Sequence, residues 1–157
     1  MKVFISYGSL ADQVTALRLQ ALAAVNGLTV YVPPAYTRQN VPAVLEPEAH
    51  EKLNDADVIL GVVGGTGLTE ACTRELNAGI ALQKKMIVMS DPLLALQLQP
   101  HFGSNLVVLD PANPDQAETG IVRYLKTVDA EKNVKNALLA LGTLALGLLI
   151  FAPTDRK

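Results

Sequence analysis

Five short apolar runs recur along this chain, and their alternation with other patterns constrains the fold more than any other feature. The runs cover residues 3–6, 28–32, 58–63, 86–89 and 106–109. Their nearly unbroken apolar character is typical of strands buried on both faces, as in parallel sheets. Helical patterns separate several of them, which is the arrangement of βα units. We therefore expect an α/β domain with a five-stranded parallel sheet and helices on both faces.

Apolar residues at helical spacing predict the helices between these runs. The segments with this spacing are 10–25, 68–82 and 116–128. Residues 33–47 contain four prolines and predict a loop that leads into a helix around 48–54. Pro92, Pro100 and the 110–114 cluster predict further loops.

Composition narrows the class of protein. The 157 residues suffice for one domain with a sizeable core. Lys and Arg total 13 against 15 Asp and Glu, which argues against a nucleic-acid partner. Cys72 is the only cysteine, so an internal disulfide is excluded and a reducing compartment is favoured. His50 and His101 lack the spacing of a metal site. Residues 1–6 predict a strand instead of a signal peptide.

The carboxyl-terminal segment differs from the rest. Residues 136–152 are 17 residues without a charge, apolar around the whole helix circumference. At about 1.5 Å per residue such a helix would be roughly 25 Å long, near the lower limit for crossing a bilayer. We predict two regions: a folded domain over 1–130, on the cytoplasmic side, and a linker with a membrane helix over 131–157. A core or oligomerisation helix is the alternative for this segment.

One carboxylate stands out as a candidate catalytic group. Glu75 lies near the start of a predicted helix, just after the apolar run 58–63. Open α/β sheets bind ligands at the carboxyl ends of their strands. A carboxylate there can stabilise the positive charge that develops when an N-glycosidic bond to ribose breaks. The alternative is a first-turn acid favoured by the helix dipole and paired with Arg74 or Lys84.

Further candidates for substrate binding lie in the loops expected at the same edge of the sheet. They are Tyr7, Gly8, Ser9, Tyr36, Arg38, Gly65 and Thr66. Tyr7 could stack on a base or belong to the core, and Tyr36 and Arg38 could contact a base or diphosphate or lie at a solvated loop tip. The spacing of Cys72 with apolar neighbours favours a core residue over a nucleophile.

Three motifs, in order along residues 1–130, resemble one known family. The F-I-S-Y sequence at 4–7, followed by Asp12, is similar to the first strand and helix of a TIR (Toll/interleukin receptor) domain. Residues 53–59 resemble the family's approach to its third strand. Residues 72–76 resemble its C-x-x-E-L helix start.

This resemblance implies a flavodoxin-like fold and, in the NAD-cleaving members, hydrolysis of the nicotinamide–ribose bond in signalling or defence. Glu75 would then be the catalytic residue, with NAD as substrate and no cofactor or metal. Residues 33–40 match the BB loop, which the family uses to gate the nucleotide pocket and to make TIR-to-TIR contacts. A homo-oligomer anchored to a membrane is therefore expected.

Some residues depart from the family pattern and keep two alternatives open. Gly8 and the 64–67 loop replace residues common in the family, and Ala71 stands where many members carry Trp. Loss of that Trp favours a non-enzymatic adaptor that acts by self-association. Gly65-Thr66 together with residues 78–88 is also similar to nucleoside deoxyribosyltransferases, which are N-glycosidases of a related α/β core.

Overall fold

The computed structural model describes residues 1–41, 43–65, 67–110 and 112–130. Strands and helices alternate along this part of the chain, as the apolar runs predict. The elements are β1 (Lys2–Tyr7), α1 (Leu10–Val25), β2 (Thr29–Tyr31), α2 (Tyr36–Gln39), α3 (Pro47–Asp55), β3 (Val58–Val63), α4 (Glu70–Ala81), β4 (Lys85–Ser90), α5 (Pro92–Phe102), the 3-10 turn η1 (Gly103–Asn105), β5 (Leu106–Val108) and α6 (Pro114–Ala130).

The strands form one parallel sheet in the order β2-β1-β3-β4-β5. Val3 of β1 pairs with Val30 on one side and Val58 on the other. This is the order of doubly wound sheets of the flavodoxin type, in which the chain reverses direction across the sheet between β1 and β3. The predicted α/β class and the five-stranded parallel sheet are therefore confirmed.

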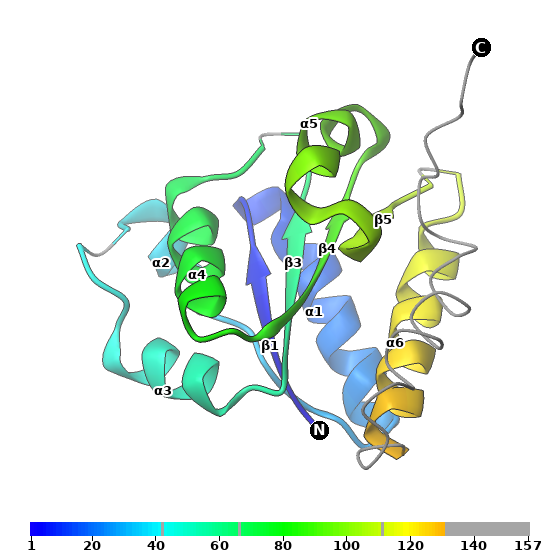
Figure 1. The fold of residues 1–157 in the computed structure, drawn as a ribbon, viewed down its shortest axis with the longest axis horizontal. Coiled ribbons are helices and arrows are strands. Elements are labelled where there is room, and N and C mark those ends of the chain that lie inside the picture. Colours follow the sequence, from blue (N-terminus) through cyan, green and yellow to red (C-terminus); the bar gives the residue numbers. More distant parts are fainter. Residues whose placement is uncertain (42, 66, 111, 131–157) are drawn as a thin grey trace.

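Helices cover both faces of the sheet (Figure 1). Successive side chains of β1 point to opposite faces, so each residue of β1 packs against the helices of one face. Val3, Ile5 and Tyr7 belong to a core cluster that includes residues of α1 and α6. Phe4 belongs to the opposite cluster, with residues of α3, α4 and α5. Ser6 has the same parity as Phe4, so this polar side chain faces α4 from inside the core.

The prediction of loops around Pro92 and Pro100 is wrong, because both prolines lie in α5. Pro92 occupies the first helical position, where its missing N–H has no intrahelical partner to lose. Asp91 caps the helix, because its Oδ1 accepts hydrogen bonds from Leu93 N at 3.0 Å and Leu94 N at 2.9 Å. Pro100 lies in the last turn, before Phe102 ends the helix.

The predicted membrane helix lies outside the described residues, as does the whole of 131–157. Among the helices that the structure describes, none has both the length and the apolar character needed to cross a membrane.

Candidate functional site

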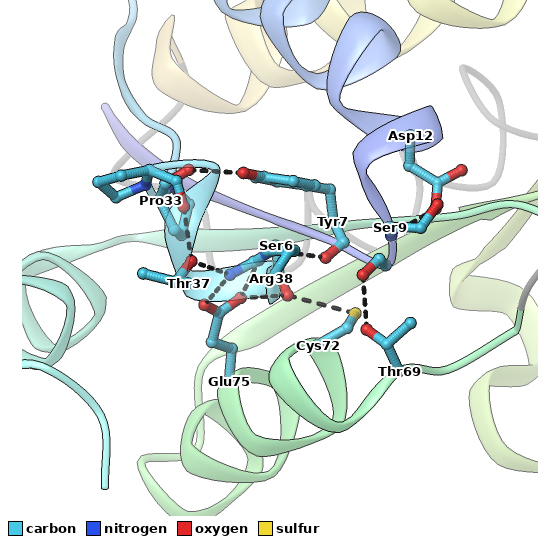
Figure 2. Close-up of polar contacts among 12 residues, drawn as sticks. Ser6, Tyr7, Ser9, Asp12, Pro33, Thr37, Arg38, Thr69, Cys72 and Glu75 are labelled. Carbon is cyan, nitrogen blue, oxygen red and sulfur yellow. Dashed lines mark hydrogen bonds and ion pairs between the residues drawn. The ribbon is translucent and has the colours of Figure 1, made fainter. Parts of the chain in front are cut away.

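Glu75 lies on α4 with its carboxylate directed toward the end of β1 (Figure 2). The residue is 3% exposed. Its carboxylate forms a bidentate ion pair with Arg38, in which Nη1 donates to Oε1 at 2.8 Å and Nη2 donates to Oε2 at 2.7 Å. The Arg38 side chain is itself only 2% exposed. The pair is therefore removed from solvent on both sides, where charge-assisted hydrogen bonds of this geometry are strong.

Arg38 makes further contacts at the end of β1. Its Nε donates to the main-chain carbonyl of Tyr7 at 3.0 Å, and its Nη1 donates to Thr37 Oγ1 at 2.9 Å. The guanidinium carbon lies 4.0 Å from the centroid of the Tyr7 ring, a cation–π contact. The guanidinium thus connects α2 with β1 as well as with α4.

Ser6 supplies the third contact to Glu75. Its hydroxyl donates to Glu75 Oε2 at 2.6 Å and also lies 3.3 Å from Cys72 Sγ. A hydroxyl has one proton, so the short bond to the carboxylate is the stronger of the two. Both carboxylate oxygens of Glu75 are therefore hydrogen-bonded in this arrangement, Oε1 to Arg38 and Oε2 to Arg38 and Ser6.

Two side chains anchor the segment that carries Arg38. The Tyr7 hydroxyl donates to the carbonyl of Pro33 at 2.9 Å. Thr37 Oγ1 donates to the carbonyl of Pro34 at 2.6 Å. Tyr7 is fully buried, and burial raises the pKa of its phenol above the usual value. The first bond ties the turn after β2 to the end of β1, and the second holds the turn itself.

The loops after β1 and β3 meet beside this site, at the switch point of the sheet. Gly8 N donates to the carbonyl of Val62 at 2.9 Å, and Thr69 Oγ1 donates to the carbonyl of Gly8 at 2.6 Å. A Cβ on Gly8 would lie 2.8 Å from Asp12 Oδ2. A larger residue at this position would therefore require the Asp12 side chain to shift.

A small cleft adjoins the ion pair. It lies between α2, α3 and α4, and both Arg38 and Glu75 line it. Arg74 lines it as well, with an Nη1 that is buried and has no hydrogen-bond partner among the residues described. The other terminal nitrogen, Nη2, pairs with Glu70 Oε1 at 2.7 Å.

No protein-family model matches this chain, and no curated protein matches it significantly. The functional argument therefore depends on the residues and their geometry.

The structure brings four of the predicted site residues together, namely Glu75, Arg38, Tyr7 and Gly8. The remaining candidates lie farther out. Tyr36 is 52% exposed and donates to Glu46 Oε2 at 2.7 Å, and the Ser9 N–H donates to Asp12 Oδ2 at 2.9 Å at the start of α1. Gly65 is exposed in the loop after β3, and Thr66 lies outside the described residues.

Sequence reasoning missed several polar residues of the site: Ser6, Thr37, Glu46 and Arg74. The alternative interpretation of Glu75 paired it with Arg74 or Lys84, whereas its partner is Arg38, 37 positions earlier in the chain. The one available signal was Ser6, a hydroxyl inside an otherwise apolar run. Its parity along the strand places it on the α4 face.

Cys72 does not have the properties of a nucleophile. Burial raises the pKa of its thiol to about 12, so the reactive thiolate is scarce at neutral pH. No group of His, Cys, Asp or Glu residues in the described part of the chain is arranged to hold a metal ion.

Proposed function

We propose that this chain is a TIR-like NAD hydrolase in which Glu75 is the catalytic carboxylate. The observation that carries the proposal is the position of this buried carboxylate. It lies beside the switch point of a flavodoxin-type sheet and borders a cleft between α2, α3 and α4. A buried acid that lines a cleft at this edge of the sheet is a candidate for a functional group.

The chemistry follows from the bond that breaks. The C1′–N bond of the nicotinamide riboside cleaves, and the bonding electrons leave with the ring, which departs as neutral nicotinamide. Positive charge then develops on C1′ and the ring oxygen of ribose. The carboxylate of Glu75 would stabilise this charge at short range. Water adds to C1′ and loses a proton, which gives ADP-ribose and nicotinamide.

The ion pair with Arg38 defines an inactive arrangement within this proposal. A guanidinium that donates two hydrogen bonds to Glu75 cancels the negative charge that the transition state requires. Activity would therefore depend on movement of α2 away from α4. Ser6, held on β1, would keep its 2.6 Å hydrogen bond and orient the released carboxylate toward the cleft.

The ion pair between Glu75 and Arg38 favours one second candidate, a non-enzymatic adaptor. In that case the Arg38–Glu75 pair fixes the conformation of residues 33–40, and this segment contacts another copy of the chain. Tyr36 is the exposed large side chain of the segment and suits such an interface. A nucleoside deoxyribosyltransferase-like activity is the third possibility, distinguished by its substrate.

We also propose that the protein is anchored to a membrane. Anchoring through residues 136–152 would place residues 1–130 at the cytoplasmic surface, where NAD is available, and would raise the local concentration for self-association. The full chain should then remain with membranes under alkaline carbonate extraction. Release into the soluble fraction would contradict the anchor.

The deciding experiment compares release of nicotinamide from NAD by the full-length wild type and by Glu75→Gln. The substitution keeps the size of the side chain but removes its charge, so turnover by the folded variant should fall at least about a hundredfold, the loss typical of removing one transition-state contact. Glu118→Gln is a matched control. Glu118 is also buried, at 4% exposure, and pairs with Arg18 at 3.1 Å, but it lies on α6, whose apolar residues belong to the core cluster on the opposite face.

Each outcome selects one candidate. Equal turnover by wild type and Glu75→Gln would refute the catalytic role of Glu75. Self-association without any NAD consumption would favour the adaptor, and release of a base from a deoxynucleoside but not from NAD would favour the transferase.

A further inference from the structure

All the lysines of the described part of the chain lie at one edge of the sheet, the edge where its parallel strands begin. They are Lys2, Lys52, Lys84, Lys85 and Lys126, and they define the lysine edge. Lys2 is the first residue of β1 and Lys85 the first residue of β4. Lys52 lies in the last turn of α3, which ends just before β3. The candidate site lies at the opposite edge, where the strands end.

Hydrogen bonds hold the other two lysines at this edge. Lys84, between α4 and β4, donates to the main-chain carbonyl of Asn54 in the last turn of α3. Lys126, on α6, donates to Asn26 Oδ1 at the end of α1, at 3.4 Å. The ends of α1, α3 and α6 therefore reach the same edge as the starts of the strands.

Helix dipoles account for only part of this pattern. Cations are favoured near the carboxyl ends of helices, and Lys52 and Lys126 occupy such positions. Lys2 and Lys85 begin strands, so this rule does not account for them. The edge thus gathers more cations than the helix ends call for.

Three carboxylates at this edge are engaged by groups of the edge itself. Asp55 Oδ2 lies 3.1 Å from Lys2 Nζ, and Asp57 Oδ2 accepts the main-chain N–H of Lys2 at 2.7 Å. Asp129 Oδ1 pairs with the amino group of Met1 at 2.7 Å. A fourth carboxylate, Glu51, is exposed on α3.

Four cations remain at the lysine edge beside these pairs. Within the described residues, no ion pair with a carboxylate is formed by Lys52, Lys84, Lys85 or Lys126. Outside the edge, the described chain carries nine carboxylates against four arginines. An anionic surface would therefore attract the lysine edge and repel the rest of the domain.

Exposed apolar side chains lie beside the lysines. Val25, the last residue of α1, is 86% exposed and precedes Asn26, the residue that Lys126 contacts. Leu82 follows the end of α4 and is 39% exposed. Cations next to exposed apolar side chains are typical of surfaces that lie against the headgroups of a membrane.

The end of α6 determines which edge would face the membrane in the proposed anchoring. The described chain ends at Ala130, at the same end of the molecule as the amino terminus (Figure 1). Residues 131–135 include Lys132 and Lys135 and span at most about 17 Å. With residues 136–152 in a bilayer, the end of α6 would lie within that distance of the headgroups.

We propose that the lysine edge binds the anionic lipid headgroups of the membrane that holds the anchor, and keeps the edge with Glu75 turned away from the bilayer. Groups of about four to eight cations beside a membrane helix bind anionic lipids in this way. The inference rests on the proposed anchoring through residues 136–152 and is independent of the proposed reaction.

The test compares full-length protein in vesicles of phosphatidylcholine alone and in vesicles that also contain roughly 30% phosphatidylglycerol. A fluorophore on Val25→Cys reports proximity to a lipid with a nitroxide on its headgroup. Leu93→Cys is the matched control, 82% exposed at the start of α5, at the opposite edge. Cys72 is buried, so the label reacts with the introduced thiol.

Quenching at Val25→Cys should be at least about twofold stronger in the anionic vesicles, and about 0.5 M salt should remove the difference. Leu93→Cys should show no difference. Adding Lys52→Gln and Lys85→Gln to Val25→Cys should remove most of the effect, because each lysine near an anionic surface changes binding by about fivefold. Lys52→Arg with Lys85→Arg keeps both charges and should preserve it.

Three results would each overturn the proposal: equal quenching at Val25→Cys in the two kinds of vesicle, equal lipid dependence at Val25→Cys and Leu93→Cys, or equal lipid dependence in the Gln and Arg variants. Flotation of the same samples tests the anchor separately, since an anchored chain floats with both kinds of vesicle. Flotation with the anionic vesicles alone, together with the quenching difference, would support the lysine edge and contradict the anchor.

Discussion

The Arg38–Glu75 pair makes a quantitative prediction about stability, which a double-mutant cycle can measure. Arg38→Met keeps an alkyl chain over the Tyr7 ring but removes the cation, and Glu75→Gln keeps an acceptor for Ser6 but removes the anion. Each single variant leaves one buried charge without its partner. Breaking a buried pair in this way costs about 3–5 kcal/mol.

The double variant should recover much of that loss, because neither side chain is then charged. Replacing both members of a buried pair by neutral groups of similar volume is often close to neutral. We therefore expect a coupling free energy of about 2–4 kcal/mol. Domains of this size have unfolding free energies of about 5–15 kcal/mol, so each single variant should lose a large share of its stability.

Urea unfolding of the four full-length proteins gives the coupling from the midpoints and slopes. Lys2 and Asp55 provide a control pair, with an Nζ–Oδ2 distance of 3.1 Å but side chains 58% and 49% exposed. Its cycle, with Lys2→Met and Asp55→Asn, should give below about 1 kcal/mol. A coupling for Arg38 and Glu75 no larger than that of the control pair would refute the reasoning that burial strengthens this contact.

Three further predictions concern other groups. Burial raises the pKa of Glu118 above its usual 4.5, so above pH 4.5 the folded protein keeps a proton that the unfolded chain releases, and stability falls as pH rises through the raised pKa. Glu118→Gln should remove this dependence of the unfolding free energy on pH in urea titrations from pH 4 upward. An unchanged dependence would contradict the raised pKa of Glu118. Cys72 should resist a maleimide at pH 8 in the native protein and react in urea, because its pKa of about 12 keeps the thiol protonated and burial blocks access of the reagent. Fast labelling of the native protein would show instead that α4 opens readily. If activity needs self-association, Tyr36→Ala should lower NAD turnover per molecule most at low protein concentration, and Tyr36→Phe is the control that keeps the ring. A rate strictly proportional to protein concentration in the wild type and both variants would exclude a requirement for self-association.

Much of the scaffold could be predicted from the sequence because it depends on local patterns. The apolar runs gave all five strands within two residues at either end, and helical spacing predicted α1, α4 and α6. Helix α5 is not predicted from the sequence, because Pro92 is a loop signal by the proline rule although Asp91 before it is a good cap. The proline rule describes helix interiors, and the first turn is an exception to it.

The candidate site was only partly predictable, because its key contact is not local. Nothing in the spacing of the chain indicates that Arg38, from the turn after β2, reaches Glu75 on α4. That contact depends on β1 lying between β2 and β3 in the sheet. Residues on loops can be assigned to an edge of the sheet from the sequence, but which guanidinium meets which carboxylate depends on side-chain packing in three dimensions.

The shortness of β2 has a consequence for native-state hydrogen exchange. This edge strand has three registered pairs with β1, and the segment that follows it is held mainly by side chains, through Arg38, Thr37 and the hydroxyl of Tyr7. Elements with few backbone hydrogen bonds open at a lower free energy than the centre of a sheet. Amide protons of residues 29–40 should therefore exchange as one group, well before those of β3, and the exchange rate of this group would report directly how often the carboxylate of Glu75 is uncovered.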